Sequence, residues 1–268
     1  GMENITATTM ADTEILFARF NKSAVEDLVS HELAHSWFGN LVTCRNWAEL
    51  WLNEGFATFM EAAYREKMYG RADYNRKIRD DAGQFFAFDA ASKNRYALYN
   101  TLADPKNDAD LFNTVNYQKG GAVIHTLRET VGDEAFWKAV NIYLNRHKFG
   151  NVETPDLQKV MEEASGKNLD WFFRQWVYGA GYPKIQIQPT FNQATRKLNL
   201  TVTQTQKIDK STPTAFILPL EVEIQTANGE ISEKIEINRR RQSFTIQLKG
   251  KPNKFVFDKS AKLPLLDV

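Results

Sequence analysis

The sequence predicts an α+β protein in which a mainly helical domain, residues 1–182, precedes a small β-sandwich domain, residues 183–268. Apolar residues recur with a helical period as far as about residue 180, and they alternate with polar residues beyond it. Net charge also reverses: residues 1–182 carry 20 Lys and Arg against 25 Asp and Glu, whereas the remainder carries 14 against 8. Two parts that differ in both period and charge indicate two domains.

Six amphipathic segments predict the helical domain. Their apolar residues recur every three to four positions, which is the spacing of one helix face. The segments are residues 23–37, 47–68, 74–86, 117–131, 134–146 and 156–164. Thr154 followed by Pro155 is typical of an N-cap and a first helical turn, so the last helix is expected to begin there. The polar segment 100–116 is predicted to be a loop.

Six short segments in which apolar and polar residues alternate predict the β-sandwich. They are residues 184–188, 197–205, 220–225, 231–237, 243–248 and 255–257. Asn228-Gly229 lies between two of these segments and is a strong signal for a two-residue hairpin turn.

Composition excludes several classes of function. The net charge of +1 predicts no bulk attraction to nucleic acid, and no apolar run is long enough to span a membrane. Cys44 is the only cysteine, so no intrachain disulfide can form. These features leave open whether the protein is cytoplasmic or is secreted, for example to a periplasm.

The sequence His31-Glu32-Leu33-Ala34-His35 predicts a zinc site. Residues four apart share a helix face, so both imidazoles can reach one ion at about 2.0–2.1 Å. Glu32 lies beside them, where its carboxylate can hold a metal-bound water and take its proton. Because so short a motif also occurs by chance, a third ligand is needed to support it.

Glu54 is the predicted third ligand. It lies on the second long helix, and eighteen residues separate it from His35, so a helix–loop–helix can turn back and bring it to the histidines. Two His and one Glu leave a fourth position open, which is the pattern of catalytic zinc sites. Glu61, seven residues later on the same helix face, is predicted either to orient a ligand histidine through its second ring nitrogen or to be an ordinary surface glutamate.

These motifs resemble those of a known enzyme family. HELAHSWFGNLVT followed by LWLNEGFATFMEA is similar to the zinc region of the M1 aminopeptidases, in the gluzincin group. Gly1-Met2-Glu3-Asn4 is similar to the end of that family's G-x-M-E-N motif, and Tyr117-Gln118-Lys119-Gly120 to its Y-x-K-G segment. The resemblance covers residues 1 to about 183. It implies a thermolysin-like zinc-peptidase domain, followed by the β-domain that often succeeds it.

The resemblance implies a role for each matching residue. Glu32 would be the general base, and Tyr117 would donate a hydrogen bond to the oxyanion of the tetrahedral intermediate. Glu3 would bind the free α-ammonium group of a peptide, while the main chain around it, at Met2 and Asn4, aligns the peptide as an added strand. Zn²⁺ is the implied cofactor, and peptides with a free N-terminus are the implied substrates. Glu3 could instead have no role, and Tyr117 could be a half-buried tyrosine at a helix start.

Other conspicuous residues are predicted to be structural. His125 and His147 lie within amphipathic helices, which favours structural or surface roles. Cys44 lies between the two zinc helices, but the family pattern does not use it, and we expect a buried, inert thiol. Three tryptophans are expected in the core rather than in a substrate platform: Trp37, Trp47 and Trp51.

The resemblance also implies that parts of the family architecture are missing. Full-length members carry a large N-terminal β-domain, and many carry a helical C-terminal domain that closes the active site. Surface that such parts would cover could support self-association. Two alternatives to an active aminopeptidase follow. One is a zinc-binding, peptidase-like fragment that is inactive on its own, and the other is an epoxide hydrolase of the leukotriene A4 hydrolase type.

Overall fold

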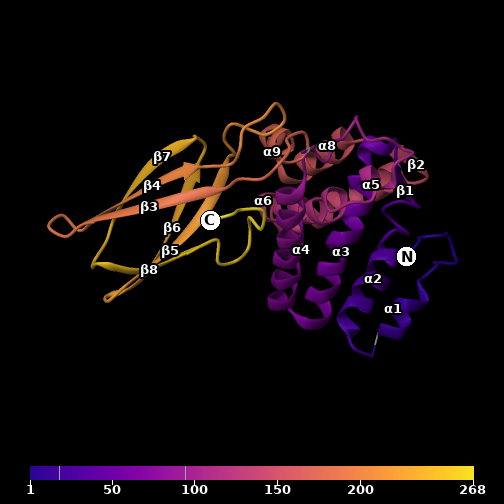
Figure 1. The fold of residues 1–268 in the computed structure, drawn as a ribbon, viewed down its shortest axis with the longest axis horizontal. Coiled ribbons are helices and arrows are strands. Elements are labelled where there is room, and N and C mark those ends of the chain that lie inside the picture. The colour runs from indigo at the N-terminus through magenta and orange to yellow at the C-terminus, as the bar shows by residue number, and fades with distance from the viewer. Residues whose placement is uncertain (18, 94) are drawn as a thin grey trace. The chain divides into compact units, whose positions relative to one another are not determined.

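The computed structural model describes residues 1–17, 19–93 and 95–268. They form two compact units, Gly1–Tyr178 and Gly179–Val268 (Figure 1). The first unit consists mainly of helices and the second of antiparallel strands, which confirms the predicted α+β class. Within the described ranges, no helix combines the length and the apolar character needed to cross a membrane.

The first unit contains helices of very different lengths. They are α1 (Asp12–Phe17), α2 (Lys22–Ala34), α3 (Trp51–Tyr69), α4 (Arg71–Ala91), α5 (Asp108–Leu111), α6 (Gly120–Val131), α7 (Asp133–His147), α8 (Thr154–Ser165) and α9 (Asp170–Trp176). A 3-10 helix, η1 (Trp47–Glu49), and a π-helix, η2 (Val115–Lys119), precede α3 and α6. A short parallel pair joins β1 (Val42–Cys44) to β2 (Gly150–Val152). The predicted loop 100–116 therefore contains α5, and the short helices α1 and α9 and the strand pair β1 and β2 were not predicted.

Helix α3 is the centre of this unit and contacts α2, α4 and α6. Its side chains are buried almost continuously over the first three turns. It meets α6 at two glycines: a Cβ on Gly55 would lie 3.0 Å from Gly120 Cα, and one on Gly120 would lie 2.9 Å from Gly55 Cα. The two backbones thus touch at a point where neither residue can carry a side chain without a shift of the helices.

The start of α8 differs from the prediction by one residue. Glu153 is the N-cap, and its N–H donates to Asp156 Oδ2 at 2.9 Å as one half of a capping box. Thr154 is the first helical residue, and its buried hydroxyl has another use: it donates to Glu49 Oε2 at 2.6 Å and accepts from Trp51 Nε1 at 3.1 Å. The hydroxyl therefore ties α8 to the beginning of α3.

The expectation that all three tryptophans lie in the core is wrong for two of them. Trp51 is fully buried, but the exposed fractions of Trp37 and Trp47 are 46% and 50%. Trp37 lies in the turn that follows α2, and Trp47 begins η1. Both therefore lie on the connection between α2 and α3, where the chain runs along the surface.

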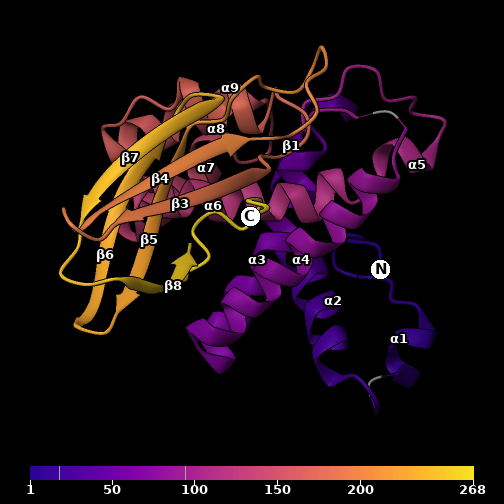
Figure 2. The ribbon, with the colours of Figure 1, turned by 60° about the vertical axis from the view of Figure 1, so that its left-hand side comes forward.

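The second unit contains two three-stranded antiparallel sheets (Figure 2). Their orders are β3-β4-β7 and β6-β5-β8, formed by β3 (Ile185–Asn192), β4 (Lys197–Gln204), β5 (Leu218–Thr226), β6 (Gly229–Ile237), β7 (Arg241–Gln247) and β8 (Pro252–Phe257). Alternate residues of the central strands β4 and β5 are buried and form the core of the unit. The predicted hairpin closes where Thr226 pairs with Gly229, whose φ is +119°.

Candidate active site

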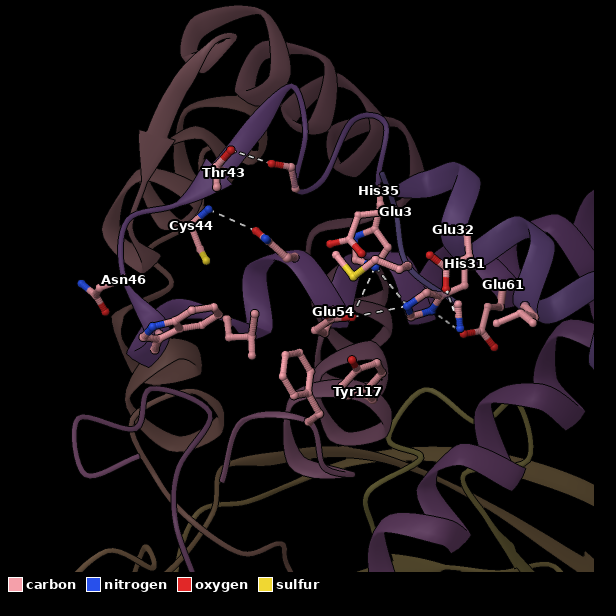
Figure 3. Close-up of a pocket in the computed structure, with 18 of the residues that line it drawn as sticks. Glu3, His31, Glu32, His35, Thr43, Cys44, Asn46, Glu54, Glu61 and Tyr117 are labelled. Atoms are coloured by element: carbon pink, nitrogen blue, oxygen red, sulfur yellow. Dashed lines mark hydrogen bonds and ion pairs between the residues drawn. The ribbon is translucent and has the colours of Figure 1, made fainter. Parts of the chain in front are cut away.

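Helices α2 and α3 bring the predicted metal ligands together (Figure 3). His31 lies in the last turn of α2, and His35 is its C-cap residue. Glu54 lies in the first turn of α3. All three side chains are buried, and their ligand atoms form a group that could hold a metal ion.

The distances among these ligand atoms match a tetrahedral zinc site. The two Nε2 atoms of His31 and His35 are 3.1 Å apart, and each lies 3.3 Å from Glu54 Oε2. Zinc binds nitrogen and oxygen at about 2.0–2.1 Å, so neighbouring ligands of a tetrahedral ion lie about 3.3–3.4 Å apart. The triangle therefore has the size that one zinc ion requires.

Hydrogen bonds at the other ring nitrogens show which histidine atoms carry protons. His31 Nδ1 lies 2.8 Å from Glu61 Oε1, and His35 Nδ1 lies 2.8 Å from the carbonyl oxygen of Phe38. Both oxygens are acceptors, so each Nδ1 donates a proton, and once a histidine has lost its second proton its Nε2 presents a lone pair. The two lone pairs face each other beside Glu54 Oε2, which is buried and has no hydrogen-bond partner among the described residues. Such a concentration of buried donor atoms needs a cation, and a zinc ion fits it.

The same geometry shifts the pKa values of the ligands. Burial lowers the pKa of His31, but hydrogen bonds and charge from Glu54 and Glu61 outweigh burial and raise it to about 9. Burial raises the pKa of Glu54, but the two histidines outweigh it and lower the value to about 2. Without a metal ion the site therefore holds a proton at neutral pH, and a metal ion must displace it.

Glu32 lies in a pocket of about 910 Å³ in the helical unit, together with the three predicted ligands. Its side chain is buried, and the oxygen Oε2 has no hydrogen-bond partner in the described part of the chain. Ligand atoms of Glu3, Glu32 and His35 also lie within 4.8 Å of one another. The Glu32 carboxylate therefore lies close to His35, and one of its two oxygens has no partner among the described residues.

The three predicted substrate-binding residues are placed differently. Met2 and Glu3 line the pocket, and Asn4 lines a neighbouring hollow on the same unit, which Glu3 also borders. The N–H and C=O of Met2 both bond to Thr9, at 2.9 and 3.0 Å, so those groups of Met2 are already used. The carbonyl oxygen of Glu3 accepts a hydrogen bond from Asn40 Nδ2 at 3.0 Å, which fixes the main chain at this residue.

Tyr117 lies in the π-helix η2 and faces the histidines from the other side of the pocket (Figure 3). Its ring stacks on that of His31, with centroids 5.7 Å apart and planes 6° from parallel. Burial and the nearby carboxylates, Glu54 first among them, raise the pKa of the phenol well above its usual range. Tyr117 therefore keeps its proton and can act as a donor.

Two residues near the site were missed by sequence reasoning. Lys77 of α4 is buried and contacts Glu61, and Asn40 anchors Glu3. Lys77 and Asp81 lie four apart on a helix, so they resemble an ordinary exposed ion pair. No signal in one sequence distinguishes that pair from a buried one.

Glu61 and the residues predicted to be structural have clear positions. Glu61 lies against His31 rather than on the surface. His125 is buried and lies 2.6 Å from the hydroxyl of Tyr74, and His147 is half-buried at the end of α7. Cys44 is half-buried rather than fully buried, and burial raises the pKa of its thiol to about 11, so it stays protonated.

Comparison with known proteins identifies both units. Residues 1–176 match the Peptidase family M1 domain, and residues 181–268 match a domain of unknown function, DUF3458, with an Ig-like fold. A probable aminopeptidase 1 from Saccharolobus solfataricus is 32% identical over 254 residues, which are 89% of this chain and 32% of the relative. The Tricorn protease-interacting factor F2 of Thermoplasma volcanium is 31% identical over 240 residues, 88% of this chain and 30% of the relative.

A solved structure shares the fold. The crystal structure of Legionella pneumophila aminopeptidase A in complex with aspartic acid matches with a TM-score of 0.66 and 21% identity, over 91% of this chain and 27% of that one. The chain thus spans about a third or less of the proteins that it matches. Because the family domain covers well over half of its residues, the chain belongs to peptidase family M1.

Proposed function

We propose that this chain is the catalytic part of a zinc-dependent aminopeptidase, which hydrolyses the N-terminal peptide bond of peptides. The observation that carries the proposal is the triangle of His31 Nε2, His35 Nε2 and Glu54 Oε2, with both Nδ1 protons committed elsewhere. Membership of family M1 and relatives named as aminopeptidases support it.

His31, His35 and Glu54 would hold the zinc ion, with a fourth position left for water or substrate. When bound, zinc lowers the pKa of a water molecule toward neutrality and polarises a carbonyl group. The free Oε2 of Glu32 would take the proton of the attacking water and deliver it to the leaving amine. Tyr117, which keeps its proton, would donate to the oxyanion as it develops.

Glu3 would give the enzyme its requirement for a free N-terminus. Its carboxylate lies next to Glu32 and His35, so a bound α-ammonium group would place the first peptide bond beside the metal position. The bond from Asn40 to the carbonyl of Glu3 holds this residue in place. An N-acetylated peptide has no charge to pair with Glu3 and would leave the carboxylate without its counter-ion.

The test is the hydrolysis of a panel of aminoacyl-coumarin substrates by the zinc-loaded chain, with N-acetylated versions as controls. We expect turnover of the free-amine substrates only, and its loss on treatment with a chelator. Equal turnover of acetylated and free substrates would contradict the role of Glu3. Turnover that survives complete removal of the metal would contradict the zinc mechanism.

A second candidate is a zinc-binding fragment that is inactive on its own. The observation in its favour is that the chain spans only about a third of its relatives. One zinc ion bound per chain, without turnover of any substrate in the panel, would support this alternative.

A further inference from the structure

A line of buried and half-buried ionisable residues extends from His31 into the helical unit. Glu61 accepts from His31 Nδ1 through Oε1 and binds Lys77 Nζ through Oε2, both at 2.8 Å. Lys77 Nζ also lies 2.7 Å from both carboxylate oxygens of Asp81. Lys77 is 7% exposed and Asp81 is 1% exposed. Four side chains thus form an unbroken series from a predicted metal ligand to the core.

We propose that Lys77 and Asp81 are positioning residues for the metal ligand His31, and that they act on it through Glu61. The inference rests on the proposed function, because it takes His31 as a zinc ligand. It adds a third helix, α4, to the two that carry the metal site.

Each member of the series requires the next. The side chain of Glu61 is 13% exposed, and only one of its two carboxylate oxygens is used by His31. A carboxylate with so little access to water is costly if one oxygen has no partner, and Lys77 supplies that partner. The buried ammonium group of Lys77 then needs a further carboxylate, which Asp81 supplies.

The spacing of the residues on three successive helices suits this role. The metal ligands of α2 are four residues apart, Glu54 and Glu61 of α3 are seven apart, and Lys77 and Asp81 of α4 are four apart. Each pair lies on one helix face, and α3 contacts both of the other helices. The orientation of the His31 ring is therefore determined by the packing of α4 on α3 as well as by its own helix.

The substitution Lys77→Met tests the proposal by the direction in which zinc affinity changes. Removal of a positive charge near a cation site would, by Coulomb's law alone, strengthen zinc binding. A positioning role predicts the opposite, because Glu61 loses the contact that fixes its orientation. Loss of such outer partners typically costs 10- to 100-fold in metal affinity, and we expect Lys77→Met to weaken zinc binding about tenfold.

Arg65→Met is the matched control. Arg65 of α3 is 8% exposed and joins Asp27 of α2, at 2.6 Å, to Asp73 of α4, at 3.5 Å. It thus links the same three helices through a cation of similar burial. No interaction found among the described residues joins Arg65 to His31, His35 or Glu54. Arg65→Met should lower the unfolding temperature as Lys77→Met does, but should change zinc affinity less than twofold.

Zinc affinity is measured on the full 268-residue chain by competition with a chromophoric chelator, beside thermal unfolding of the metal-free protein. The visible absorption of the Co²⁺-substituted chain reports the ligand geometry directly. We expect a changed Co²⁺ spectrum for Lys77→Met and an unchanged one for Arg65→Met. Asp81→Asn keeps an acceptor for Lys77, so it should fold even where Lys77→Met does not, and should weaken zinc binding in the same direction.

A double-mutant comparison assigns the effect to Glu61. In a Glu61→Gln background, Lys77→Met should change zinc affinity less than twofold. Two results would overturn this inference and leave the proposed function intact. One is unchanged or tighter zinc binding by Lys77→Met and Asp81→Asn. The other is a loss of zinc affinity from Lys77→Met that is as large in the Glu61→Gln background as in the parent chain. A parent chain that binds no zinc would overturn the proposed function and the inference together. If the parent chain binds zinc but has no turnover, the zinc affinities of the variants still decide the inference.

Discussion

The two sides of the pocket are held in different ways. On the side proposed to bind metal, His31, His35 and Glu54 are buried on or at the end of a helix, and the Nδ1 atoms of both histidines have hydrogen-bond partners. On the substrate side, Met2 is half exposed, and Glu3 is held through its main chain by Asn40. A metal site tolerates errors of only a few tenths of an ångström, so its ligands need this support. A peptide contributes its own contacts, and the residues that receive it can be held by fewer bonds.

The replacement Glu32→Gln should cause the largest loss, because it removes the proposed general base but keeps the shape of the proposed metal site. We expect kcat to fall about 10²–10⁴-fold while zinc binds with nearly unchanged affinity. Steady-state kinetics and metal analysis of the same preparation measure both. Near wild-type turnover in a zinc-loaded Glu32→Gln chain would rule out the mechanism.

Tyr117→Phe should have the next largest effect. It removes the proposed oxyanion donor and leaves the ring that stacks on His31. The expected loss is about 10²–10³-fold in kcat, with little change in KM, because the bond forms only as the oxyanion develops. A rise in KM at constant kcat would instead place Tyr117 among the residues that bind the ground state.

Zinc affinity should depend steeply on pH. The dependence should come from the proposed metal ligands and not from the residues proposed to bind substrate. The raised pKa of His31, about 9, means that zinc must displace a proton below that pH. Affinity should therefore increase as pH rises, by about tenfold per unit for one displaced proton, and level off above about 9.

Stability of the metal-free chain should respond in the opposite direction. The folded pKa of His31 lies above the usual 6.5, so its stabilising contribution is complete below about 6.5 and is lost as pH rises through about 9. Thermal unfolding of the apo and zinc forms across this range measures the contrast. A zinc affinity that does not vary with pH would mean that the histidine pair holds no proton.

Gly120→Ala tests whether the contact between α3 and α6 sets the spacing of the two sides. The new Cβ would meet Gly55 Cα at 2.9 Å, so the helices must separate. We expect a loss of about 1–3 kcal/mol in stability and a fall in kcat, since Tyr117 lies just before Gly120 and Glu54 next to Gly55. Gly83→Ala in α4 is the control, because its Cβ would meet nothing within 4 Å. If both substitutions changed stability and kcat equally, the contact between α3 and α6 at Gly55 and Gly120 would have no special role.

Asn40→Ala should have the smallest effect and should act on the substrate side alone. It deletes the hydrogen bond to the carbonyl of Glu3, a contact worth about 0.5–1.5 kcal/mol. We expect KM for free-amine substrates to rise a few-fold, with zinc affinity unchanged. A loss of zinc affinity in this variant would mean that the two sides are not held independently.

Much of the fold was predictable because apolar residues keep one spacing in each unit, a helical period in the first and strict alternation in the second. Six amphipathic segments and six alternating ones became helices and strands, with limits that differ from the predicted ones by up to five residues, since one face of each must be buried. Errors occurred where a tertiary contact overrides a local signal. Thr154 looks like an N-cap, but its hydroxyl bonds to Glu49 and Trp51, residues more than a hundred positions away.

The sequence by itself determined the chemistry available to this protein: two histidines four apart, a glutamate between them, and a further glutamate on the next helix. Spacing along a helix is a local property, so these residues and their shared faces can be read in one dimension. The tertiary structure alone decided the 3.1–3.3 Å triangle of ligand atoms, the contact of Gly55 with Gly120, and the burial of Lys77 and Asp81 behind Glu61. Whether an ion pair on a helix is exposed or supports a metal ligand depends on which helix packs against it, and that packing is a property of the whole unit.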